Sequence, residues 1–209
     1  ETLKIKIDLE PEDIEKEINT NNFGFMFAPN YHSAMRSVGP IRKKIGKRTI
    51  FNMIGPLSNP ALVNRQVVGV FDIKLLSIFA EALKNLKIKF AWIVHSNDGL
   101  DEISPYDVTN VCQLNDGKID NIKINPKDLG INSSNFENLI GKESDYNAEK
   151  IIEIFSGKDN DFSTAVCLNA AAGLIVSEKF TDFKRAYNHS KEFILSGKAL
   201  DHLKNIQNV

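Results

Sequence analysis

The first 60 residues have the pattern of short helices followed by a loop. Asp8 to Glu12 is a typical helix start, because a proline stands in the first turn and acids lie near the positive end of the helix dipole. Further helices are predicted over residues 32–38 and 40–45. Residues 52–60 contain Gly and Pro without a helical or strand period, which predicts a loop and a candidate hinge.

From Arg65 onward, the pattern changes to strands that alternate with helices. Residues 66–71 are apolar and rich in Val, and residues 90–94 are strongly apolar. Residues 73–86 between them place apolar side chains on one helical face. Strand, helix and strand at this spacing are typical of a right-handed βαβ unit. The chain therefore contains an α/β segment.

The remaining segments predict a hairpin and a helical carboxyl-terminal part. The hairpin pairs residues 108–114 with 118–124, because an Asp-Gly pair between them suits a tight turn. Helices are expected over residues 147–155, 163–176, 181–195 and 199–206.

Composition and charge restrict the function only broadly. The 209 residues carry a formal net charge of −1, with both signs interspersed, which argues against bulk binding of nucleic acid or of an anionic membrane. Cys112 and Cys167 lie in apolar stretches, which favours reduced core thiols in a cytoplasmic protein. No apolar run approaches the roughly 20 residues of a membrane span.

The strongest chemical signal is an acidic turn directly after the predicted strand 90–94. Asp98, Asp101 and Glu102 stand in this turn, and ligands of α/β sheets commonly bind at the carboxyl ends of strands. Adjacent carboxylates repel each other unless a cation lies between them, and Mg²⁺ suits such oxygen ligands. The alternative is a solvated loop whose acids cap the next element, and for an isolated turn that alternative is favoured.

Three further groups of residues could carry function, and the first two allow two interpretations each. Arg42 suits bidentate binding of a carboxylate, but with its lysine neighbours it also fits a solvated basic face, and His32 fits a helix cap. Residues 48–60 suit either an ordered ligand-facing turn or a hinge. Asn169 lies in an apolar helix and must find a partner, which predicts a structural hydrogen bond between core elements.

Four blocks, in order, carry a resemblance to a known family. They read Y-H-x-A-M-R, P-I-R-K-x-x-G-x-R-T-I-F-N-x-x-G-P-L-x-N-P, V-H-S-N-D-G-L-D-E-I-S-P and L-N-A-A-A. The chain resembles the anthranilate phosphoribosyltransferases of tryptophan biosynthesis over most of its length. The resemblance implies a nucleoside phosphorylase/phosphoribosyltransferase-like α/β fold, with a βαβ-containing sheet flanked by helices. It also implies a partial helical domain and hinge over residues 1–60 and an α/β domain over 61–209.

The activity implied by the resemblance is Mg²⁺-dependent transfer of the 5-phosphoribosyl group from phosphoribosyl pyrophosphate to anthranilate, with pyrophosphate leaving. By the same resemblance, Asp101 and Glu102 are the expected Mg²⁺ ligands and Arg42 the expected partner of the anthranilate carboxylate. The anthranilate path would be lined by His32, Gly55 and Pro56. No residue is assigned to acid or base catalysis, because an aromatic amine is already a nucleophile. The family also implies a homodimer.

One large difference separates this chain from the family pattern. The 209 residues contain neither the glycine-rich G-T-G-G-D phosphate loop nor the K-H-G stretch. The expectation is a carboxyl-terminal fragment that lacks the amino-terminal third and is inactive alone. The alternatives are a non-catalytic binding module or a paralogue with a different acceptor.

Overall fold

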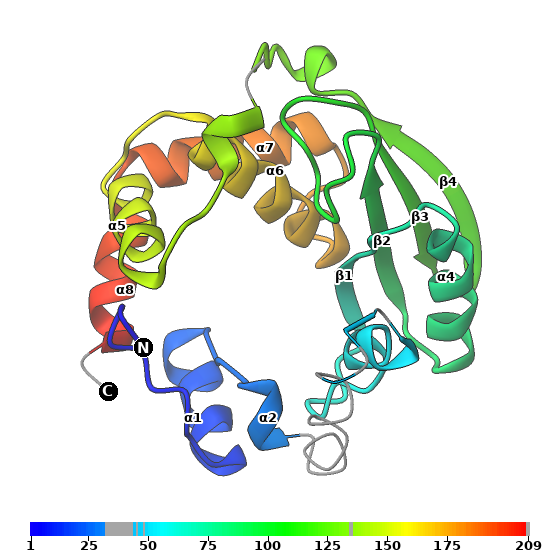
Figure 1. The fold of residues 1–209 in the computed structure, drawn as a ribbon, viewed down its shortest axis with the longest axis horizontal. Coiled ribbons are helices and arrows are strands. Elements are labelled where there is room, and N and C mark those ends of the chain that lie inside the picture. Colours follow the sequence, from blue (N-terminus) through cyan, green and yellow to red (C-terminus); the bar gives the residue numbers. More distant parts are fainter. Residues whose placement is uncertain (32–43, 45, 48, 134–135, 208–209) are drawn as a thin grey trace. The chain divides into compact units, whose positions relative to one another are not determined.

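The computed structural model describes residues 1–31, 44, 46–47, 49–133 and 136–207 and divides the chain into two compact units (Figure 1). The first unit is Glu1–Leu62 with Leu200–Val209, and the second is Val63–Ala199. The helices predicted over 32–38 and 40–45 fall almost wholly outside the described residues. Within the described part, no helix is long and apolar enough to cross a membrane.

The first unit contains the helix predicted from Asp8 to Glu12. Helix α1, Pro11–Asn21, begins with proline in its first turn and ends at a left-handed Asn22. Among the described residues of this unit, α1 is followed by α2 Ala28–Tyr31 and by the 3₁₀ turns η1 Ile50–Asn52 and η2 Gly55–Leu57. Helix α8, Lys198–Gln207, begins in the second unit and ends in the first. The segment predicted as a loop, residues 52–60, thus begins at the last residue of η1 and contains η2, a 3₁₀ turn that local hydrogen bonds form without an apolar period.

The second unit is built on a four-stranded sheet in the order β1-β2-β3-β4. Its strands are β1 Arg65–Gly69, β2 Phe90–Ser96, β3 Thr109–Asn115 and β4 Lys118–Ile124. Strands β1 and β2 pair in parallel, and helix α4, Leu75–Asn85, connects them in the sequence. The pairs β2–β3 and β3–β4 are antiparallel. The βαβ unit and the hairpin predicted from the sequence are confirmed.

Further helices and 3₁₀ turns follow the sheet in the sequence. They are η3 Pro126–Leu129, η4 Phe136–Leu139, α5 Ser144–Phe155, α6 Asp161–Val176 and α7 Phe183–Leu195. Among them, α6 packs on β1 and β2. Figure 1 shows α4 and α6 on opposite sides of the sheet. The α/β fold expected from the sequence is confirmed.

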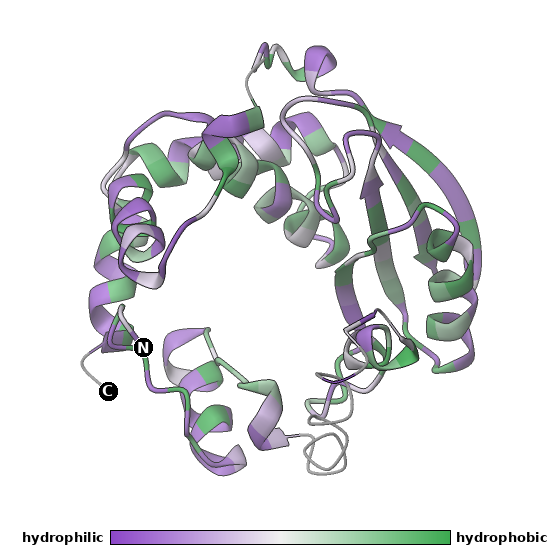
Figure 2. Cartoon of the chain, in the orientation of Figure 1, coloured by the Kyte–Doolittle hydropathy of each residue, from purple (hydrophilic) through white to green (hydrophobic). Residues whose placement is uncertain are grey.

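Strand β2 is apolar from Phe90 to Val94 because both of its faces are covered. Phe90, Trp92 and Val94 belong to the main core cluster with residues of α6 and α7, while Ala91 and Ile93 between them are fully buried outside that cluster. The indole ring of Trp92 packs on Phe183 of α7 with the ring centroids 5.6 Å apart. In contrast, the edge strand β4 contains both hydrophilic and hydrophobic residues along its length (Figure 2).

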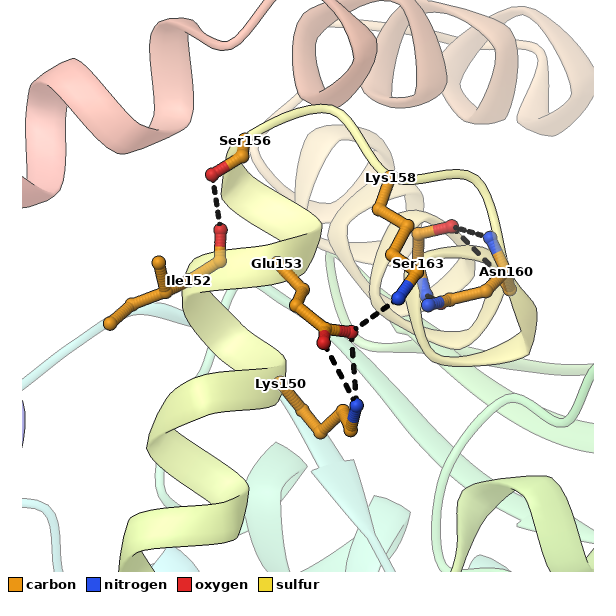
Figure 3. Close-up of polar contacts among 7 residues, drawn as sticks. All are labelled: Lys150, Ile152, Glu153, Ser156, Lys158, Asn160 and Ser163. Carbon is orange, nitrogen blue, oxygen red and sulfur yellow. Dashed lines mark hydrogen bonds and ion pairs between the residues drawn. The ribbon is translucent and has the colours of Figure 1, made fainter.

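The connection from α5 to α6 is fixed by polar contacts that determine where α6 begins (Figure 3). The Glu153 carboxylate pairs with Lys150 of its own helix and with Lys158 beyond the helix end. Asn160 and Ser163 then form a reciprocal capping box, in which each side chain binds the backbone N–H of the other at 2.9 Å. This cap sets the start of α6 and thereby the position of Asn169, two turns along the helix.

Candidate functional site

The acidic turn leaves β2 at its carboxyl end, as predicted. The backbone N–H of Ser96 donates to the Leu100 carbonyl at 2.9 Å, and Gly99 donates back to the Ser96 carbonyl at 3.0 Å. Gly99 has a φ angle of +95°, in the left-handed region that glycine adopts without a steric penalty. The turn is therefore an ordered structure at the end of a buried strand.

Asp98 has a structural role within this turn. Its carboxylate accepts a hydrogen bond from the Leu100 N–H at 3.2 Å and another from the Ser104 hydroxyl. Ser104 is fully buried, and its N–H donates to the Thr109 hydroxyl at 3.1 Å. Asp98 therefore stabilises the turn itself.

Asp101 and Glu102 follow with their side chains exposed to solvent. Partial burial by neighbouring protein atoms, and then repulsion from Asp101, raise the pKa of the Glu102 carboxyl above its usual value. Among the described residues, no ion pair neutralises either carboxylate. A bound cation would relieve this repulsion.

Helix α6 holds the turn through Asn169. The Ile103 N–H donates to Asn169 Oδ1 at 2.9 Å, and Asn169 Nδ2 donates to the Ile103 carbonyl at 3.1 Å. The same Nδ2 lies 3.4 Å from Glu102 Oε2 and 3.0 Å from the Ala165 carbonyl. The predicted structural hydrogen bond of Asn169 is confirmed, and its partner is the acidic turn.

A second anchor to α6 lies at the far end of the turn. The Tyr106 hydroxyl donates to Asp161 Oδ2 at 3.3 Å, and Ser133 and Asn138 donate to the same carboxylate at 2.8 and 2.6 Å. Burial, and then the nearby Asp161 charge, raise the pKa of Tyr106 to about 12, so that its hydroxyl remains a donor at neutral pH. The turn is thus tied to α6 both beside Glu102 and beyond Ser104.

The end of β1 touches the acidic turn from another side. A Cβ atom added to Gly69 would lie 1.7 Å from the Asp101 carbonyl oxygen, so the backbone of the turn occupies the place of a side chain. Sequence reasoning overlooked Gly69, although a glycine in a strand is a known sign of close backbone approach.

The expected substrate-binding residues are not part of this turn. Two of them belong to the first unit, and the other two lie outside the described residues. Gly55 and Pro56 lie in η2 of the first unit, and a Cβ added to Gly55 would meet no atom within 4 Å. His32 and Arg42 lie outside the described residues. The structure therefore brings together Asp101, Glu102 and Asn169, and leaves the remaining assignments as expectations.

The Asp101–Glu102 pair suits a Mg²⁺ ion that is bound jointly by the protein, water and substrate, rather than one enclosed by protein ligands alone. Among described residues, no group of three or more His, Cys, Asp and Glu side chains is placed to hold a metal ion. Two adjacent carboxylates fit the usual manner of Mg²⁺ binding, in which one or two acids are supplemented by water and substrate phosphates. The residues present fit this ion.

The sequence matches a family model over residues 1–200, which covers the sheet, the acidic turn and α6. The chain belongs to the glycosyl transferase family, a/b domain. Similar members of the family include the anthranilate phosphoribosyltransferase of Pelagibacter ubique, 70% identical over all 209 residues and 63% of that protein. The anthranilate phosphoribosyltransferase of Clostridium kluyveri is 43% identical over 99% of this chain and 62% of its own length.

Solved structures agree with this family membership. Anthranilate phosphoribosyltransferase from Thermus thermophilus superposes with a TM-score of 0.91 at 32% identity, over 99% of this chain and 61% of that chain. The Saccharomyces cerevisiae enzyme in complex with PRPP and Mg gives a TM-score of 0.89 at 26% identity, over 99% and 60% of the two chains. This glycosyl transferase family chain thus spans less than two thirds of the length of these relatives.

Proposed function

We propose that this chain is part of an anthranilate phosphoribosyltransferase. The polypeptide would transfer the 5-phosphoribosyl group of phosphoribosyl pyrophosphate to the amine of anthranilate, in tryptophan biosynthesis. The observation that carries the proposal is the exposed pair Asp101 and Glu102, held at the carboxyl end of β2 by contacts from α6. The relatives of this chain share the name of that activity.

In the proposed reaction, the amine nitrogen forms a bond to the anomeric carbon of the ribose. The bond from that carbon to pyrophosphate breaks, its electron pair leaves with pyrophosphate, and the amine releases a proton to solvent. Mg²⁺, when bound, neutralises the negative charge that develops on pyrophosphate. Asp101 and Glu102 would hold that ion, while the hydrogen bonds of Asn169 keep the two carboxylates in place beside it.

The acceptor side of the reaction rests on residues of the first part of the chain. We propose that Arg42 binds the anthranilate carboxylate through two parallel hydrogen bonds, a geometry that Lys cannot match. His32, Gly55 and Pro56 would line the path of anthranilate. A paralogue with another carboxylated acceptor is the second candidate, and retention of Arg42 is compatible with both.

We propose a cytoplasmic location for the enzyme from its cysteines, and its assembly from the family. Cys112 and Cys167 are buried free thiols, which supports a reducing, cytoplasmic location. Burial raises the pKa of the Cys167 thiol to about 11, so it is a core residue rather than a nucleophile. We propose a homodimer as the assembled form, on the family resemblance alone.

The test is a reconstitution of the complete polypeptide. This chain would be joined to those parts of the Pelagibacter ubique relative that lie outside the matched region. We call this chimera the completed polypeptide. Pyrophosphate release that requires anthranilate, phosphoribosyl pyrophosphate and Mg²⁺ together supports the proposal. Release only with another carboxylated amine would identify the paralogue, and no release with any of them would refute the transferase assignment. The 209-residue chain alone is expected to give none.

A further inference from the structure

The contact between Gly69 and Asp101 is the closest that any described glycine makes at its Cβ position. An added Cβ would lie 1.7 Å from the Asp101 carbonyl oxygen and 2.8 Å from its carbon. Real Cβ atoms essentially never come within 3.0 Å of another heavy atom. The obstacle is backbone, which has no rotamer by which to move aside.

The reason for glycine at this position is therefore space and not backbone conformation. The φ angle of Gly69 is not positive, so residues with a side chain could adopt its backbone conformation. It pairs with Val94 in the register of β1 and β2, close to where β2 leads into the acidic turn. A side chain here would have to push the Asp101 backbone away from the sheet by about 1 Å or more.

On the other side of the turn, Asn169 binds both backbone polar groups of Ile103, two residues after Asp101. Ile103 is 1% exposed and anchors this part of the turn in the core. Glu102 lies between these two contacts and also accepts from Asn169 Nδ2 at 3.4 Å. The two carboxylates therefore stand on a short backbone segment that is fixed at both ends.

We propose that Gly69 and Asn169 are positioning residues for the Asp101–Glu102 pair, with Gly69 providing the space and Asn169 the hydrogen bonds that set where the two carboxylates stand. Neither residue reaches a substrate in this role. Residues that orient metal ligands in this manner typically affect metal affinity by about 10- to 100-fold. That the pair binds Mg²⁺ rests on the proposed function, whereas the contacts that position the turn do not depend on it.

The experiment compares Gly69→Ala with Gly173→Ala in the completed polypeptide. Gly173 lies exposed in α6, and a Cβ there would meet nothing within 4 Å, so it is a matched control for the added methyl group. Binding of Mn²⁺ in the presence of pyrophosphate is measured by electron paramagnetic resonance, and amide hydrogen exchange is measured over residues 98–104. Far-UV circular dichroism reports the fold.

The expected result is that Gly69→Ala keeps the fold, binds Mn²⁺ at least about tenfold more weakly and exchanges the amides of the turn faster. Gly173→Ala should match the wild type in each readout. A folded Gly69→Ala with unchanged Mn²⁺ affinity and unchanged exchange would overturn the proposal. If Gly69→Ala does not fold, Asn169→Ala decides the matter, with the same loss supporting the proposal and unchanged values refuting it.

The design separates this inference from the proposed function. If the wild-type polypeptide releases no pyrophosphate or does not bind Mn²⁺, the transferase assignment fails while hydrogen exchange still tests whether Gly69 and Asn169 hold the turn. If the wild type is active and both variants keep its exchange rates and Mn²⁺ affinity, only the positioning role fails.

Discussion

The clearest consequence of the structure for stability concerns Asn169→Ala. Among the described contacts, the Asn169 amide is the hydrogen-bond partner of both the N–H and the carbonyl of Ile103. Ile103 is 1% exposed, so the variant would leave two polar backbone groups largely without a partner. A buried polar group that loses its partner costs about 1–3 kcal/mol.

The helix itself gains from the change, because alanine has the higher helix propensity by roughly 0.6 kcal/mol. Asn169 is only partly buried, so that water reaches part of the vacated site and reduces the loss. We therefore expect the free energy of unfolding to fall by about 2 kcal/mol in total.

The assay is urea unfolding of the completed polypeptide, followed by the fluorescence of its β2 tryptophan. Trp92 is the single tryptophan of this chain and lies in the core cluster with Ile103 and α6; tryptophans in the added segment would be replaced by phenylalanine. Asn188→Ala is the matched control, because Asn188 is also an asparagine within a helix but lies exposed in α7. That variant should be slightly more stable than the wild type, and equal shifts for the two variants would refute the reasoning.

Two further changes test the structure around the turn. Gly173→Ala should raise the free energy of unfolding by about 0.5–1 kcal/mol, seen as a higher urea midpoint, because glycine is unfavourable in a helix interior. Burial raises the pKa of the Asp161 carboxyl, but hydrogen bonds from Asn138, Ser133 and Tyr106 outweigh it and hold this pKa below its usual value. The ionised carboxylate therefore stabilises the folded protein at pH values above the pKa of an unfolded aspartate. This stabilisation is lost as the pH falls through the lower pKa of the folded state. The difference in urea midpoint between wild type and Asp161→Asn should therefore be largest near neutral pH and shrink below about pH 4.

Apolar runs, apolar periodicity and turn residues predict the strands and the longer helices of the second unit, but not its 3₁₀ turns η3 and η4. β2 was expected over residues 90–94 and extends over Phe90–Ser96, and the helix expected over 163–176 is Asp161–Val176. These elements follow from local pattern and from capping residues, which the sequence shows directly. The helical pattern is weaker before residue 60, where the apolar residues follow no long helical period and the predicted loop contains the 3₁₀ turn η2.

The candidate site was only half visible in the sequence. Adjacent carboxylates after a strand can be recognised locally, but the contacts of Asn169 and Gly69 with the turn join residues 66 and 32 positions apart in the chain. No local pattern states which backbone group a buried amide will bind. The glycine at the end of β1 is the signal that sequence reasoning could have used.

Domain limits were expected at residue 60, with all later residues in the α/β part. The structure divides the chain between Leu62 and Val63 and groups Leu200–Val209 with the first unit. In that unit Gln207 Nε2 donates to the Leu3 carbonyl at 2.7 Å. Such pairing of the two chain ends depends on tertiary packing and leaves no periodic signal in the sequence.

The central claim is that Asp101 and Glu102 hold the Mg²⁺ on which phosphoribosyl transfer depends. The most direct test is Asp101→Asn combined with Glu102→Gln in the completed polypeptide, with pyrophosphate release measured against Mg²⁺ concentration at fixed anthranilate and phosphoribosyl pyrophosphate. We expect a folded protein whose release at saturating substrate falls by at least about 100-fold, because the charge that develops on pyrophosphate is no longer neutralised. Release with the wild-type rate and the wild-type Mg²⁺ dependence would contradict the account.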